Sequence, residues 1–258
     1  MILFQDKVVD IVDSFTMDNL PHTILIRGEY GSGKHLLAHR IAQRFNFSLI
    51  DITDNLNQDT INEIYVSTTV NFYIINSDKI SIKDQNTILK FLEEPCVNAY
   101  IILLNSTGLL LDTIQNRCFE LTMGIYDKNM LETFSFDSPY SDLILEIART
   151  PGQATDYVNE DFKGMYDFAQ LIFQHIRTAN LSNCLTITRR IAFKGPEKDK
   201  FNVDTFVRIL LHIASKLDTD IYMFTDKLCN DLAIPNVNKQ LVFESYILNL
   251  KYRTQHHE

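Results

Sequence analysis

Cysteine is scarce in this sequence: only four occur in 258 residues, and they lie far apart. They are Cys96, Cys118, Cys184 and Cys229. No two form a Cys-x-x-Cys pair, so neither a zinc site of clustered thiolates nor a disulfide framework is predicted, and a reducing cytoplasmic setting is expected. Long apolar runs are also missing, because none approaches the roughly 18 residues that cross a bilayer. The first residues lack the basic segment of a signal peptide, so no membrane association is expected.

An excess of basic residues is missing as well. The sequence has 24 lysines and arginines against 33 acidic residues, a formal net charge of −9. This balance argues against a protein that coats DNA through bulk positive charge, although a local contact to phosphate stays open. Apolar residues make up 45% of the chain, which is enough for the cores of one to three small globular domains.

Five short apolar runs in the first half of the chain indicate β-strands. They are residues 23–26, 48–50, 72–75, 100–104 and 118–121. Most are continuously apolar rather than alternating, as in strands that are covered on both faces. Helical patterns separate them, notably residues 35–45 and a segment that Ser81 caps and Pro95 ends. The sequence therefore predicts an α/β fold with a parallel sheet and helices on both faces.

The pattern changes after about residue 123, where strand signals give way to helical periodicity. Apolar residues follow helical spacing over 165–176 and again over 203–217. We therefore predict an α/β domain over residues 1–122, a small helical domain over 123–162 and a third helical domain over 163–258.

A phosphate-binding loop is the strongest local signal. The segment after the first predicted strand reads Gly28, Glu29, Tyr30, Gly31, Ser32, Gly33, Lys34 and His35. It has the spacing G-x-x-x-x-G-K between a strand and a helix. In such a loop, backbone amides, the helix N-terminus and Lys34 can bind the phosphates of ATP or ADP. A glycine-rich turn that binds nothing is the alternative, so bound nucleotide stays open at this point.

The residues that would hold Mg²⁺ are missing from their usual places. His35 replaces the Ser or Thr hydroxyl that follows the lysine, and a neutral imidazole is a poor ligand for this hard ion. The predicted strand 72–75 runs into Asn76 and Ser77 rather than into a pair of acids. Asp78 is the only carboxylate nearby and is expected in a turn or helix cap. We therefore expect no Mg²⁺ site and no useful ATP hydrolysis by this chain alone.

Several motifs follow one another along the chain in a recognisable order. They are Leu20-Pro21-His22, the loop at 28–35, Ser77 to Ser81, a helix ending in Leu92-Glu93-Glu94-Pro95, Asn116-Arg117-Cys118, Thr150-Pro151-Gly152-Gln153-Ala154, and residues 236–244. This series resembles the AAA+ clamp-loader subunits, most closely the delta-prime and gamma/tau family of bacterial DNA polymerase III. The resemblance spans nearly the whole chain, with the Leu-Glu-Glu-Pro helix and the Arg-Cys turn as its specific parts.

The resemblance implies a fold, partners and roles. The fold is an AAA+ P-loop domain, a small helical lid and an all-helical collar domain. The partners are other clamp-loader ATPase subunits in a hetero-oligomeric, pentameric ring, a sliding clamp, and primer–template DNA bound by the assembled ring. Arg117 would be an arginine finger that reaches the ATP of a neighbouring subunit, Asn105 and Ser106 would be sensor residues, and Ser81, Ile82 and Lys83 would be candidates for DNA contact.

The sequence also departs from that family. Residues 36–95 contain no cysteine, so the family's zinc module is not expected, and Gln153 stands where a sensor arginine is usual. Two alternatives stay open: an active ATPase that holds metal through His35 and Asp78, and a P-loop-derived interaction module without a clamp. For Arg117 alone, a local salt bridge is the alternative to the finger role.

Overall fold

The computed structural model describes residues 4–106, 110–134, 136–193, 200–232, 234 and 237–256. They divide into two compact units, one made of residues 1–134 with 149–153 and the other of residues 135–148 with 154–258. Each is described by itself below. Asn236, in one of the motifs above, lies outside the described residues.

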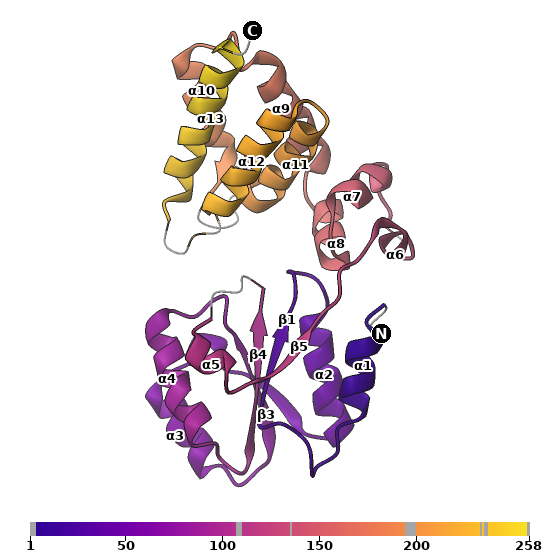
Figure 1. Cartoon of the computed structure of the whole chain (residues 1–258), viewed down its shortest axis with the longest axis vertical. Helices are drawn as coiled ribbons and strands as arrows, with labels where there is room; N and C mark the ends of the chain where they lie inside the picture. Colours follow the sequence, from indigo (N-terminus) through magenta and orange to yellow (C-terminus); the bar gives the residue numbers. More distant parts are fainter. Residues whose placement is uncertain are drawn as a thin grey trace. The chain divides into compact units, whose positions relative to one another are not determined.

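A five-stranded parallel sheet forms the centre of the first unit (Figure 1). Its strands are β1 (Thr23–Arg27), β2 (Ser48–Asp51), β3 (Asn71–Asn76), β4 (Ala99–Asn105) and β5 (Phe119–Thr122). Their order across the sheet is β2-β3-β4-β1-β5, and every pairing is parallel. Because all strands point the same way, the ends of β1, β3 and β4 meet at one edge, where loops can build a site.

Helices cover both faces of this sheet because alternate residues of each central strand point to opposite faces. In β1, Ile24 and Ile26 pack under α1 (Asp6–Asp13) and α2 (Lys34–Phe45). Leu25 faces the other way, toward a second set of helices. These are α3 (Gln58–Val66), α4 (Ile82–Glu93) and α5 (Asp112–Gln115). The sheet therefore separates two apolar cores, each closed by its own helices.

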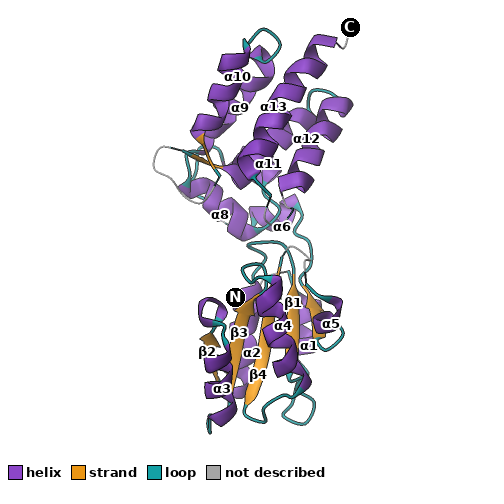
Figure 2. Cartoon of the chain, turned by 90° about the vertical axis from the view of Figure 1, so that its left-hand side faces the viewer, coloured by secondary structure: helices purple, strands orange, loops and turns teal. Residues whose placement is uncertain are grey.

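The second unit is almost entirely helical (Figure 2). Its helices are α7 (Ser141–Ile147), most of α8 (Pro151–Asn159), α9 (Phe162–His175), α10 (Leu181–Ile187), α11 (Val203–Ser215), α12 (Thr219–Leu232) and α13 (Lys239–His256). Phe206 and Phe243 are fully buried at its centre, with their ring centroids 6.2 Å apart. Two-residue strands, β6 (Ile191–Ala192) and β7 (Phe201–Asn202), pair in parallel beside them.

The predicted fold class is confirmed. All five apolar runs of the first half overlap strands, and helices occupy the intervals that the patterns indicated. The β6–β7 pair was not predicted, because two residues are too few to produce a periodic signal. The domain boundaries at 122 and 162 stay predictions. Among the described residues, no helix is long and apolar enough to cross a bilayer.

Candidate functional site

The phosphate loop lies where the sequence predicts it, between the end of β1 and the start of α2. Gly31 has φ 78° and Gly33 has φ 97°, in the left-handed region where glycine carries no steric penalty. Gly33 is also the N-cap of α2, so the helix begins directly at Lys34. The first-turn amides of α2 have no intrahelical acceptor, and they give this end of the sheet the character of an anion site.

Lys34 is buried beneath the loop and makes three hydrogen bonds. Its Nζ donates to the carbonyl oxygens of Gly28 at 2.8 Å and Glu29 at 2.9 Å, and to Ser106 Oγ at 2.8 Å. These bonds use all three ammonium protons. Burial lowers the pKa of Lys34, while the carboxylates of Asp78 and Glu29 oppose that effect. The lysine thus holds its own loop closed, and an incoming phosphate would have to compete for its protons.

The loop residues fit a phosphate group better than they fit a metal ion. Ser32 is 2% exposed, and its Oγ is buried without a described hydrogen-bond partner. A buried hydroxyl in this state costs about 1–3 kcal/mol, which a phosphate oxygen in the loop would recover. Lys34 and the α2 N-terminus supply the positive charge that such a group needs.

The donor set does not fit Mg²⁺. His35 stands in the hydroxyl position, and partial desolvation lowers the pKa of its exposed ring, against a weaker opposing effect of Asp51. Both carboxylate oxygens of Asp78 accept the backbone N–H of Ser106 at 2.9 Å. Asn76 Oδ1 accepts the backbone N–H of Asp78 at 3.1 Å. A neutral imidazole is a poor ligand for Mg²⁺, and the amide and carboxylate oxygens that could bind the ion already accept hydrogen bonds from the chain.

The predicted sensor residues lie beside Lys34. Asn105 ends β4 and is 1% exposed; its Nδ2 donates to Ser77 Oγ at 2.8 Å. Ser106 follows it and accepts a hydrogen bond from Lys34. The carboxyl ends of β3 and β4 therefore form one polar network with the phosphate loop. Ser106 contacts Lys34 and Asn105 joins the same network, while the sensor role that the resemblance implies stays a prediction.

Residues 149–153 pack against the outer side of the loop, within the first unit. Thr150 Oγ1 donates to the carbonyl of Tyr30 at 2.7 Å, and the Gly152 N–H donates to the carbonyl of Gly31 at 3.1 Å. Gln153 is buried; its Nε2 donates to Glu29 Oε2 at 3.3 Å and its Oε1 accepts the Arg149 N–H at 2.9 Å. Gln153 thus holds the phosphate loop from its outer side.

Sequence reasoning missed Tyr126, which contacts the phosphate loop, and Gln5, which holds the chain two residues before Tyr126. Tyr126 Oη donates to the Ser32 carbonyl at 3.1 Å. Gln5 is 2% exposed, and its carboxamide pairs with both the N–H and the carbonyl of Gly124, at 2.6 and 3.3 Å. Gln5, the N-cap residue of α1, carried no sequence signal of this role, because its partner is 119 positions away.

Arg117 lies on the surface just after α5 and contacts its own chain. Its Nη2 pairs with Glu93 Oε1 at 2.8 Å, and its Nη1 donates to the Thr113 carbonyl at 2.7 Å. Both partners of the ion pair are partly exposed, at 38% and 47%. The neighbouring Cys118 thiol donates to the Ile114 carbonyl, and burial raises its pKa to about 12. The thiol therefore stays protonated and anchors the turn that carries Arg117.

The candidates for DNA contact lie at the start of α4, and a capping box occupies part of that site. The Asp84 N–H donates to Ser81 Oγ at 3.3 Å, and Asp84 Oδ2 accepts the Ser81 N–H at 3.0 Å. Ile82 and Lys83 are exposed. The box uses two amides and adds a negative charge, so only the neighbouring groups stay available to a phosphate. DNA contact by Ser81, Ile82 and Lys83 stays a prediction.

Replacing Ser81 by alanine should destabilise the first unit by about 1 kcal/mol at neutral pH, because the cap is lost. Hydrogen bonds from the Ser81 hydroxyl and N–H lower the pKa of Asp84 in the folded chain. Asp84 therefore stabilises α4 above its unfolded pKa of about 3.9, and this contribution is lost as the pH falls through the folded pKa. The difference in the free energy of unfolding between wild type and Ser81→Ala should become smaller below about pH 4, as measured by urea unfolding at a series of pH values. An unchanged difference at low pH would contradict the carboxylate's part in the cap.

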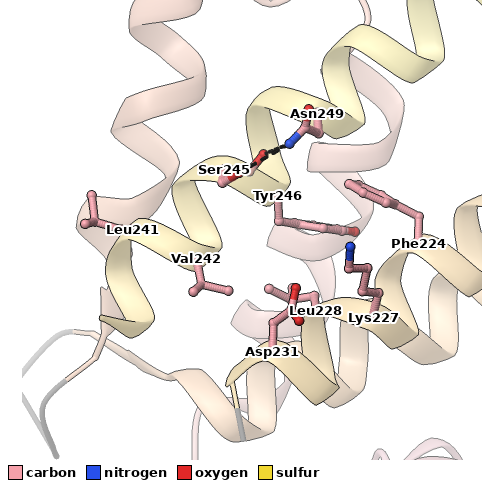
Figure 3. A pocket seen from close by; sticks show the side chains of 9 residues that line it. All are labelled: Phe224, Lys227, Leu228, Asp231, Leu241, Val242, Ser245, Tyr246 and Asn249. Atoms are coloured by element: carbon pink, nitrogen blue, oxygen red, sulfur yellow. Dashed lines mark hydrogen bonds between the residues drawn. The ribbon is translucent and has the colours of Figure 1, made fainter. Parts of the chain in front are cut away.

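The second unit has a groove of about 310 Å³ between α12 and α13 (Figure 3). Its lining residues are Phe224, Lys227, Leu228, Asp231, Leu241, Val242, Ser245, Tyr246 and Asn249. Leu241 is 60% exposed, whereas Phe243 and Tyr246 are buried. The side chains of α13 therefore differ in their surroundings: Phe243 packs into the core, whereas Leu241 lies exposed at the groove.

Comparisons with known proteins agree with this architecture. Residues 47–125, less than half of the chain, match the family model described as "DNA polymerase III, delta subunit". A solved structure of a Thermotoga maritima DNA polymerase III gamma subunit-related protein aligns with a TM-score of 0.54 and 15% identity, over 96% of this chain and 99% of its own. The Thermotoga maritima RuvB Holliday junction branch migration motor aligns with a TM-score of 0.49 and 15% identity, over 93% of this chain and 81% of its own. No curated protein matches the sequence.

The likeness to the gamma-related protein shows the fold, a parallel sheet followed by a helical region. The family match adds evidence from the sequence itself for the segment that contains α4, the Leu-Glu-Glu-Pro motif and Arg117. Residues 47–125 thus resemble the DNA polymerase III delta-subunit family, and the chain as a whole has the fold of the gamma subunit-related protein.

Proposed function

We propose that this protein is a delta-prime-like subunit of a DNA sliding-clamp loader, active in cytoplasmic DNA replication. In this role it does not hydrolyse ATP itself and supplies Arg117 to the ATP site of a neighbouring subunit. The observation that carries the proposal is the exposed Arg117 on the segment that matches the DNA polymerase III family model. A guanidinium suits the role because it keeps its charge and offers a fork of donors to phosphate oxygens.

The chemistry of the phosphate loop supports the part of the proposal in which this chain does not hydrolyse ATP itself. Lys34 donates its three ammonium protons to two carbonyl oxygens and a hydroxyl, and the hydrogen-bond donors around it suit a phosphate group rather than a hard metal ion. The phosphates of bound ATP or ADP would contact Lys34, Ser32 and the N-terminus of α2, and their negative charge would stabilise the loop. Because His35 follows Lys34 and Asn76 and Ser77 stand where a pair of acids would hold Mg²⁺ and orient a water, the loop would bind and position phosphate but would not cleave it.

The partners follow from the same proposal. Other clamp-loader ATPase subunits would complete a hetero-oligomeric ring, and the groove between α12 and α13 is where an apolar helix of a neighbour would pack. The sliding clamp and primer–template DNA would be bound by the ring, since a chain of net charge −9 has little attraction for DNA alone.

The isolated chain should show no ATPase activity above background, with or without primer–template DNA. Changing Lys34 to alanine should leave that background rate the same, because no catalytic metal site depends on it. The measurement is steady-state phosphate release at saturating ATP and Mg²⁺. Turnover that Lys34→Ala abolishes would overturn the passive role and favour an active ATPase that uses His35 and Asp78. Failure of the chain to co-purify with a cognate ATPase subunit would favour an interaction module outside a clamp loader.

A further inference from the structure

Arg27 is the last residue of β1, directly before the phosphate loop, and its guanidinium is fixed on three sides. Nη1 donates to Asn105 Oδ1 at 3.1 Å, Nη2 donates to Gln115 Oε1 at 2.6 Å, and Nε pairs with Glu120 Oε2 at 3.0 Å. Its side chain is only 20% exposed. A half-buried arginine with all of its sides engaged has one well-defined position, so it can hold its partners in place.

One of these partners leads back to the phosphate loop. Asn105 also donates to Ser77 Oγ at 2.8 Å and to Asp78 Oδ1 at 3.4 Å. Asp78 accepts the Ser106 N–H, and Ser106 Oγ accepts from Lys34. The guanidinium is therefore part of the same continuous network of hydrogen bonds as the lysine under the loop.

Another partner leads to the predicted finger. Gln115 ends α5, and its Nε2 donates to the Leu110 carbonyl at 2.6 Å, so its side chain is held at both ends. Arg117 follows two residues later; its N–H donates to the Ile114 carbonyl at 3.0 Å, and the Cys118 N–H donates to the Gln115 carbonyl at 3.1 Å. The backbone that carries Arg117 is thus built on the residue that Arg27 holds.

We propose that Arg27 is a positioning residue for Arg117: it fixes the end of α5 against β1 and β4 and links the base of the finger to the network around Lys34. The inference rests on the proposed function, because the finger role of Arg117 is part of it. A short helix of four residues has little hold on its own position, so a fixed side chain beneath it decides where the following residues lie. A finger displaced by about 1 Å loses about 100-fold in the rate it supports.

The test uses the complex reconstituted with its cognate ATPase subunits. Arg27→Met removes all three contacts. Gln115→Leu breaks the link from Arg27 to α5, together with the bond to the Leu110 carbonyl, while Arg27 keeps Asn105 and Glu120. Both variants should lower kcat for ATP by about 10- to 100-fold without changing KM for ATP. In the isolated chain, amide hydrogen exchange at Arg117 and Cys118 should become faster. Arg27→Lys should not rescue the rate, because an ammonium lacks the fork.

Arg40→Met is the matched control, because Arg40 pairs with Asp13 on the surface of α2, away from this network. It should leave both kcat and exchange at Arg117 unchanged. Arg117→Ala in the same complex separates the inference from its premise. If that variant keeps the full rate, the proposed function is wrong. If it lowers the rate while Arg27→Met and Gln115→Leu leave kcat unchanged, only the positioning role of Arg27 is overturned.

Discussion

Replacing Arg117 by alanine should lower the ATPase rate of the reconstituted clamp-loader complex by about 10³- to 10⁵-fold at the site that Arg117 completes. The loss has this size because a finger stabilises the charge that develops on the transferred phosphoryl group, a contribution made mainly in the transition state. Arg117→Lys should recover only part of the rate, since the ammonium keeps the charge but loses the fork. The measurement is kcat and KM for ATP in complexes of verified composition.

In the proposed complex, Arg117 has to break its ion pair with Glu93 before it can reach the ATP of a neighbouring subunit. Both side chains are more than a third exposed, and pairs of this kind contribute about 0–1 kcal/mol. Arg117 can therefore leave Glu93 at little cost when a phosphate is in reach. Glu93→Gln should keep the full ATPase rate, and it controls for a purely local role. A complex that assembles with Arg117→Ala and hydrolyses ATP as fast as wild type would refute the finger assignment.

Local signals explain why much of the fold was predictable. The apolar runs at 72–75 and 100–104 are long and continuous enough to indicate covered strands, and both lie in the centre of the sheet. The spacing from Gly28 to Lys34 indicates a loop between a strand and a helix, which is where it lies. Ser81, with Asp84 three residues later, marked the start of α4, and the structure has a capping box there.

The contacts that shape the site could not be predicted from local sequence patterns, because they join residues far apart in the chain. Arg27 lies 78 residues from Asn105 and 88 from Gln115, and Thr150 lies 120 residues from Tyr30. Each pairing depends on which strands become neighbours and on where a distant turn packs. Sequence reasoning could name Asn105 and Gln153 from motifs, but it could not say that one contacts Arg27 or that the other contacts Glu29.

Replacing Gly152 by valine should destabilise the contact between residues 149–153 and the phosphate loop by about 3 kcal/mol. A Cβ at this position would lie 2.5 Å from Gly31 Cα and 3.1 Å from the Gly31 carbonyl oxygen. Gly31 cannot move away easily, because its φ of 78° and the hydrogen bond that it accepts from the Gly152 N–H fix its backbone. The cost of the substitution is steric, since Gly152 itself does not have a positive φ.

The readout is amide hydrogen exchange at positions 152 and 153, which should become at least about 100-fold faster, a change that corresponds to about 2.7 kcal/mol of local stability. Thr150→Val is the matched control, read at position 152: it keeps the volume at the neighbouring position and removes the hydrogen bond to the Tyr30 carbonyl and the one that Thr150 Oγ1 accepts from the Gln153 N–H, so it should cost about 1–2 kcal/mol. The two effects should differ because a backbone clash excludes the packed state, whereas a lost hydroxyl only weakens it. Equal protection in Gly152→Val and wild type would mean that residues 149–153 do not pack on the loop in solution. The loop would then be open to solvent on its outer side, and the Gln153–Glu29 contact would not hold it.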